Sequence, residues 1–181
     1  GVLLSKDPLE FTSDDMQIAN LLVSKGANID HIEGGAQQLL HCVISANDEE
    51  VDFAAKSDLI FKIFSGDNLV VIDCVNGDDP LESLMDVYSP LNECDSEEST
   101  HIYVAALLVN AGSDISEVIC STEATTKQKK DLIECLVEMG FDLNKKDSRG
   151  SSAIIAALNG QVEPDQSLEL IRLLLGHGAD P

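Results

Sequence analysis

The residues most suited to nucleophilic chemistry are His41 and Cys42, which are adjacent in the chain. A thiol beside an imidazole base is the arrangement of a cysteine nucleophile. The apolar pattern around them predicts a helix, however, and neighbouring residues of a helix point about 100° apart. The two side chains then cannot readily hydrogen-bond to each other. We therefore predict a structural role for His41, no catalytic residues and no enzymatic activity.

Two acidic segments, 48–52 and 93–98, are the candidates for a metal site. Carboxylates bind hard cations such as calcium, but a calcium-binding loop also needs a central Gly and a terminal Glu at fixed positions. Neither segment has that order, and the sequence contains no phosphate-binding loop, nucleophile-elbow or zinc-protease motif. We interpret both segments as solvated loops and expect no metal and no cofactor.

The overall charge indicates which partners the chain could attract. Its 181 residues include 33 Asp and Glu but only 11 Lys and Arg, which gives a net charge of −22. Such a surface repels nucleic acids and anionic membranes, whereas it attracts basic partners and favours solubility. In the segment 48–98 the basic residues are Lys56 and Lys62 alone. No apolar run approaches the roughly 18 residues that would span a membrane.

The five cysteines are odd in number, widely spaced and without a C-x-x-C pair. This pattern is unlike both a disulfide framework and a zinc ribbon, and it indicates reduced thiols. We therefore predict a cytoplasmic or nuclear protein. The cysteines are Cys42, Cys74, Cys94, Cys120 and Cys135.

The elements that must position these side chains are short amphipathic helices, each ending at a glycine. Apolar residues at i, i+3, i+4 and i+7 give a helix one buried stripe. The glycine then adopts the left-handed conformation that ends a helix without a Cβ clash. The pattern recurs, at unequal intervals, before Gly26, Gly66, Gly112, Gly140 and Gly178. In the last copy the stripe expected to be buried is Leu168, Ile171, Leu174 and Leu175.

Periodicity and capping residues together predict the helix positions. Thr12 is a hydroxyl N-cap with carboxylates in the turn that follows, and Pro80 suits a first turn because it lacks an N–H. We interpret 89–100 as a polar insertion, with Ser99 or Thr100 capping the next helix. The predicted helices are 12–24, 37–45, 54–64, 80–87, 102–110, 116–122, 127–139, 152–158 and 167–175.

The stretch 140–181 carries the motif on which a family resemblance depends. Asp147, Gly150 and the run 152–155 follow the order D-x-x-G-x-T-P-L-H of the ankyrin repeat, and 178–180 matches its closing G-A-D. Asp79-Pro80-Leu81-Glu82 is a second match to T-P-L-H. The chain therefore resembles a divergent ankyrin-repeat array. The resemblance implies an all-α solenoid of stacked antiparallel helix hairpins with projecting turns and acidic loop insertions.

The resemblance covers nearly the whole chain as a single domain of about five units, of which the first and fourth are atypical. The fourth has room for only a short inner helix, and we expect a weak join there. We also expect the chain to be a fragment of a longer protein, because nothing follows to cover its Leu-rich last helix. The approximate units are 1–28, 29–66, 67–112, 113–140 and 141–181.

The resemblance implies a protein–protein interaction module that binds a partner protein or peptide through its turn tips and inner-helix groove. The tips are 30–33, 73–79, 113–117 and 145–149. The charge favours a Lys/Arg-rich partner, with no nucleic acid and no membrane involved, and we expect a monomer. The alternative is a structural or regulatory spacer that packs against neighbouring domains of a larger enzyme or signalling protein. The predicted partner-binding residues are Asp30, His31, Glu33, Gln37, Gln38, Asp73, Asn76, Asp78, Asp79, Glu82, Asp86, Lys145, Lys146, Asp147, Arg149 and Ser151.

Overall fold

The regular elements of the described chain are all helices. The computed structural model describes residues 11–29, 35–46, 51–65, 70–73, 79–87, 95–122, 124–147, 149–160 and 163–181, without the side chains of 86, 87 and 95–99. Within these ranges the helices are α1 (Ser13–Ser24), α2 (Gly35–Ser45), α3 (Phe53–Ser65), α4 (Pro80–Val87), α5 (Asp95–Ala111), α6 (Ile115–Cys120), α7 (Thr126–Glu138), α8 (Ala153–Asn159) and α9 (Pro164–Gly176). The all-α prediction is confirmed, and each predicted helix has a counterpart.

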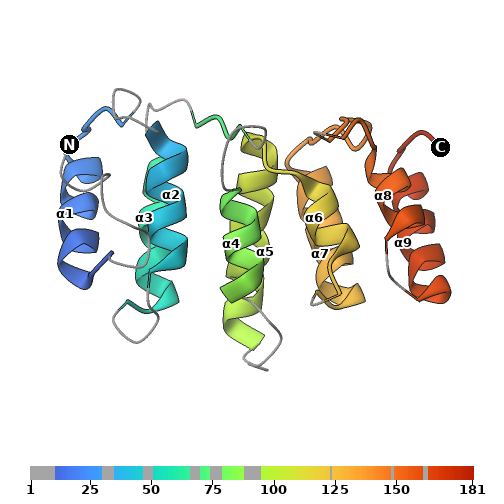
Figure 1. Cartoon of the computed structure of the whole chain (residues 1–181), viewed down its shortest axis with the longest axis horizontal. Helices are drawn as coiled ribbons and strands as arrows, with labels where there is room; N and C mark the ends of the chain where they lie inside the picture. Colours follow the sequence, from blue (N-terminus) through green and yellow to red (C-terminus); the bar gives the residue numbers. More distant parts are fainter. Residues whose placement is uncertain are drawn as a thin grey trace.

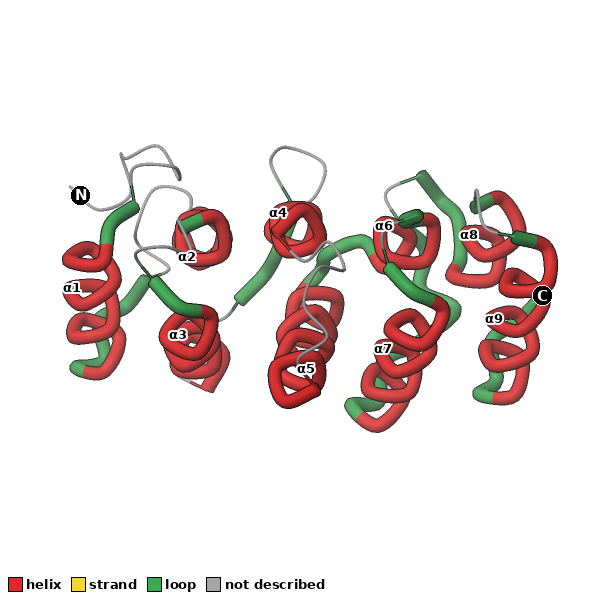
Figure 2. Tube along the Cα trace, turned by 90° about the horizontal axis from the view of Figure 1, so that it is seen from below, coloured by secondary structure: helices red, strands yellow, loops and turns green. Residues whose placement is uncertain are grey.

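The helices stand side by side in two rows, with the chain ends at opposite ends of the molecule (Figure 1). The shorter helices α2, α4, α6 and α8 form one row, and α1, α3, α5, α7 and α9 form the other (Figure 2). Successive members of each row are in contact, and so are α2 with α3, α4 with α5 and α8 with α9. Each element therefore packs mainly on elements close to it in the chain.

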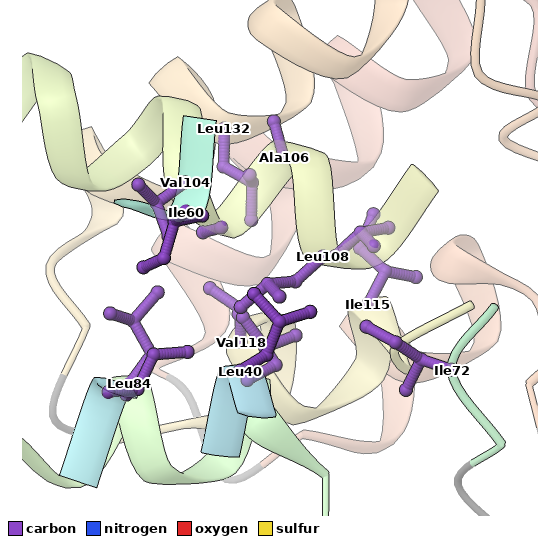
Figure 3. Close-up of a cluster of buried hydrophobic side chains, with 14 of the residues drawn as sticks. Leu40, Ile60, Ile72, Leu84, Val104, Ala106, Leu108, Ile115, Val118 and Leu132 are labelled. Carbon is purple, nitrogen blue, oxygen red and sulfur yellow. The ribbon is translucent and has the colours of Figure 1, made fainter. Parts of the chain in front are cut away.

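The core lies between the two rows and consists mostly of aliphatic side chains. Leu40 of the short row is fully buried, as are Ile60, Val104 and Leu108 of the long row (Figure 3). Burying a side chain of this size stabilises a fold by about 1.5–3 kcal/mol. Because such chains interdigitate without large aromatic rings, neighbouring helix pairs can stack closely.

Local capping explains where several helices begin. Thr12 and Asp15 form a reciprocal capping box at the start of α1. Thr125 and Gln128 form the same arrangement at the start of α7. The cap at Thr12 was predicted, and Thr125 has the same role, because the orphan N–H groups of a first turn need such acceptors.

Two helices begin three or more residues earlier than predicted. The start of α5 is Asp95, so the second half of the expected insertion 89–100 is helical. The apolar pattern does not extend into these polar residues, so it could not predict the early start. Likewise α9 begins at Pro164 rather than at Ser167. Proline is well suited to that first position because its fixed φ is already helical.

The last helix does not bury the whole apolar stripe that its sequence predicts. Leu174 is fully buried, but Leu168 and Leu175 are 46% and 45% exposed. Of the described helices, α7 and α8 are the principal neighbours of α9. The expectation was wrong for Leu168 and Leu175, because an amphipathic stripe is buried only where a neighbour covers it.

Candidate functional site

A groove of about 640 Å³ runs across the row of short helices. It is lined by α4, α6 and α8, by the residues directly after α6, and by the turn that leads into α8. No lining residue comes from the long row. We call this hollow the short-helix groove. Its lining consists of Glu82, Met85, Ser116, Glu117, Cys120, Ser121, Thr122, Asp147, Arg149, Ser151, Ile155, Ala156, Asn159 and Gly160.

The three helices contribute side chains at the same spacing. Glu82 and Met85 come from α4, Glu117 and Cys120 from α6, and Ala156 and Asn159 from α8. Each pair is separated by three residues, so its members lie on one face of their helix. The groove is therefore one continuous surface made from equivalent faces of successive helices.

An ion pair joins two of the residues that line the groove. The guanidinium of Arg149, in the turn before α8, contacts the carboxylate of Glu117 on α6. Their side chains are 67% and 39% exposed, respectively. An ion pair with this much solvent access is weak, because water and salt screen it. Separating Arg149 from Glu117 therefore requires little free energy.

Asp147 fixes the turn that carries Arg149. Its carboxylate accepts hydrogen bonds from the backbone N–H groups of Arg149, at 2.9 Å, and Ser151, at 2.6 Å. Its own N–H donates to the carbonyl of Ser151 at 2.8 Å, and Gly150 completes the turn with φ +80°. Asp147 is thus a turn-forming residue as well as a lining residue.

Several charged residues act on Glu117. Partial burial raises the pKa of Glu117, and the carboxylates of Asp114, Glu82 and Asp79 raise it further, whereas Arg149 lowers it. Among the described residues that line the groove, Arg149 is the one cation. This part of the surface would therefore accept additional positive charge.

The structure brings four of the predicted partner-binding residues together, namely Glu82, Asp147, Arg149 and Ser151. Lys145 and Lys146 are exposed and lie in the segment that precedes this turn. The ammonium of Lys145 lies 5.8 Å from the centre of the Phe141 ring.

Another set of predicted residues lies outside the groove lining. The side-chain amide of Gln37 on α2 bonds the backbone of Asp73, accepting from its N–H at 3.0 Å and donating to its carbonyl at 3.3 Å. Gln38 is half-buried, with its amide 3.9 Å from the sulfur of Cys42. Asp30, His31, Glu33, Asn76 and Asp78, together with the side chain of Asp86, fall outside the described residues.

Asp79 was predicted to bind a partner, but the structure corrects this prediction, because Asp79 is only 6% exposed. Its carboxylate accepts hydrogen bonds from the N–H of Leu81 at 2.9 Å and from the hydroxyl of Ser113 at 2.6 Å. It also accepts one from the N–H of Asp114 at 3.1 Å. Asp79 therefore joins the start of α4 to the segment before α6 and is not presented to a partner.

The sequence interpretation missed the other lining residues, among them Met85, Glu117, Cys120 and Ile155. Glu117 belongs to a predicted tip, 113–117, but it was not singled out as a binding residue. Glu82 was predicted, and the residue three positions later, Met85, lies on the same face of α4. The equivalent pair on α6 is Glu117 and Cys120. The contact between Glu117 and Arg149 could not be predicted from any local sequence pattern.

Two buried cationic side chains, Lys56 of α3 and Lys129 of α7, lie near the starts of their helices. Lys56 is 1% exposed, and its ammonium donates to the carbonyls of Ile44 at 3.2 Å and Ala46 at 2.5 Å. Lys129 is 2% exposed and donates to the carbonyl of Ser121 at 2.7 Å. These lysines bind carbonyls at the ends of α2 and α6, where the helix dipole favours positive charge.

His101 of α5 stacks on Phe53, with ring centres 3.6 Å apart. Burial, and secondarily the charge of Lys56, lower the pKa of His101 to about 3. Perturbed pKa values can mark functional sites, but His101 does not line the short-helix groove. Packing against Phe53 accounts for its position.

Within the described part of the chain, no cluster of His, Cys, Asp and Glu has the arrangement of a metal site. None of the helices there is both long and apolar enough to cross a bilayer. Comparison of the chain with protein-family models, with curated proteins and with solved structures returned no match. A functional proposal therefore depends on the residues and their geometry.

Proposed function

We propose that this chain is a divergent ankyrin-repeat array that serves as a protein–protein interaction module, with no catalytic activity of its own. The short-helix groove would bind a segment of a partner protein. The motif residues of 147–155 and 178–180, together with the two rows of stacked helices (Figure 2), support the ankyrin assignment. The thiol pattern supports a cytoplasmic or nuclear location.

The observation that carries the proposal is the composition of the groove across three successive short helices. It combines apolar contact surface from Met85 and Ile155 with charged groups from Glu82, Glu117 and Arg149. Recognition surfaces need both, since apolar area supplies affinity and placed polar groups supply orientation. Ile155 is 40% exposed, so its side chain is accessible to a partner.

A matched pair of residues on α8 tests the site. Ile155 lines the groove, whereas Leu158 is 62% exposed on the same helix and is not among the lining residues. Peptides would be selected from a displayed random library on the purified chain. Their binding would then be measured on the Ile155→Ser and Leu158→Ser variants.

We expect Ile155→Ser to weaken binding about tenfold, which corresponds to the loss of one well-buried apolar contact. Leu158→Ser should leave the affinity unchanged. Equal effects of the two changes would contradict a site in the groove. Failure of the library to yield any binder would contradict the interaction function itself.

A second candidate is a spacer that packs against neighbouring domains of a larger protein. It is favoured by exposed apolar side chains on the first and last helices. On α1 these are Ile18, Leu21 and Leu22, which are 48%, 60% and 46% exposed. Leu168 and Leu175 are similarly exposed on α9, and α1 and α9 stand at opposite ends of the helix rows (Figure 1).

Amide hydrogen exchange of α1 and α9 would test this candidate. The chain would be compared with a longer natural polypeptide that contains it. Slower exchange of both helices in the longer protein would support packing against neighbours. Identical exchange in the two proteins would leave the groove-binding module as the sole proposal.

A further inference from the structure

The groove already holds one guanidinium, and it belongs to the protein itself. Arg149 reaches from the turn before α8 to the carboxylate of Glu117 on α6. The side chain of Arg149 is 67% exposed, so solvent reaches most of it. A flexible side chain in this position can leave Glu117 without any rearrangement of the backbone.

The surroundings of Glu117 remain anionic even with Arg149 in place. Glu82 and Asp147 also line the groove, and the buried carboxylates of Asp79 and Asp114 act electrostatically on Glu117. A cation that enters from outside would therefore meet several carboxylates and one competing guanidinium. An anionic segment would have Arg149 alone to bind among the lining residues.

The apolar part of the lining suits the stem of a long cationic side chain. Met85 of α4 and Ile155 of α8 belong to the same groove as Glu117. Lysine and arginine bury their methylene groups on apolar surface while the charged end remains near polar groups. Apolar and anionic groups on one surface thus fit an Arg or Lys side chain along its whole length.

This inference rests on the proposed function. We propose that the partner segment is rich in Lys and Arg, and that one of its cationic side chains replaces Arg149 on Glu117. Arg149 is then an internal competitor that occupies the anionic site until the partner binds. An acidic segment that binds to Arg149, Lys145 and Lys146 is the opposite arrangement, and it predicts the opposite response to substitution.

Three variants distinguish these arrangements. Arg149→Gln removes the competitor, and Glu117→Gln removes the acceptor. Lys146→Gln is the control for the general effect of charge. It also removes one positive charge, from an exposed residue just before the turn that carries Arg149. Because all three side chains are on the surface, circular dichroism and thermal melting should show unchanged folding.

The probes are peptides selected from the displayed random library on the wild-type chain, each with a copy in which every Lys and Arg is replaced by Gln. We expect Lys and Arg to be enriched in the selection, and the Gln copies to bind at least tenfold more weakly. Arg149→Gln should raise the affinity several-fold more than Lys146→Gln does, and Glu117→Gln should lower it about tenfold. Raising the salt concentration should weaken wild-type binding.

Other results would overturn the inference without touching the proposed function. Selected peptides that depend on Ile155 but respond equally to Arg149→Gln and Lys146→Gln would show a groove site without exchange. Acidic peptides that lose affinity on Arg149→Gln would show the opposite charge preference. If the library yields no peptide that depends on the groove, the proposed function fails, and this inference fails with it.

Discussion

Gly112 and Ile72 approach so closely that a Cβ on Gly112 would lie 2.3 Å from the carbonyl oxygen of Ile72. The N–H of Ile72 also donates to the carbonyl of Ala111 at 3.0 Å. Gly112 ends α5 with φ +134°, a conformation that side chains rarely adopt. The segment 70–73 is therefore held against the end of α5 by a contact that only glycine permits.

The first prediction follows from this contact. Gly112→Ala should destabilise the fold by about 3 kcal/mol or more, because it combines a steric clash with an unfavourable φ. Urea unfolding followed by circular dichroism would measure the difference. Gly140 is the matched control, since it ends α7 with φ +76° and a Cβ there would meet no atom within 4 Å. Gly140→Ala should lower the free energy of unfolding by only about 1 kcal/mol. Equal losses of stability in the two variants would contradict the importance of the Ile72 contact.

Asp79 should contribute to stability rather than to binding. Asp79→Ala would remove the acceptor of three buried hydrogen bonds, and we expect a loss of about 2–4 kcal/mol. Glu82→Ala, at an exposed position in the first turn of the same helix, should change the free energy of unfolding by less than about 0.5 kcal/mol. Chemical denaturation of both variants would test this assignment. A neutral Asp79→Ala would show that the hydrogen bonds contribute little.

Lys56 should contribute more to stability than other lysines of its helix. Lys56→Met keeps most of the side-chain volume, but it leaves the buried carbonyls of Ile44 and Ala46 without this donor. We expect a loss of about 1–3 kcal/mol in the free energy of unfolding. Lys62→Met, on the exposed side of α3, removes an ion pair with Asp58 and should cost about 0.5 kcal/mol. If the two variants lose the same stability, the capping role of Lys56 is wrong.

His101 should make the fold sensitive to mild acid. Its pKa is about 3 in the folded chain, against 6.5 for an unperturbed histidine. Between these values the unfolded chain binds a proton that the folded chain does not, so stability is complete above pH 6.5 and falls as the pH is lowered. At pH 5 the loss should be about 1–2 kcal/mol.

The variant His101→Phe tests this sensitivity, because phenylalanine can stack on Phe53 but cannot bind a proton. The difference in unfolding free energy between wild type and His101→Phe should be constant above pH 7. It should then shift in favour of the variant between pH 6.5 and pH 5. A difference that stays constant across this range would mean that His101 titrates alike in the folded and unfolded chains.

The sequence alone determined the helices, because their signals are local. The apolar spacing, the N-caps at Thr12 and Thr125, and the glycines at helix ends act through residues a few positions apart. The turn around Asp147 belongs with them, since its hydrogen bonds span only a few residues. These features follow from backbone geometry that does not depend on the rest of the fold.

Only the tertiary structure decided which polar and apolar side chains are covered. Asp79 looked like a surface carboxylate and is buried, whereas Leu168 and Leu175 looked like core residues and are exposed. Glu117 and Arg149 meet although 32 positions separate them in the chain. A helix period identifies the faces of a helix, but burial and ion pairing depend on which distant element packs against each face.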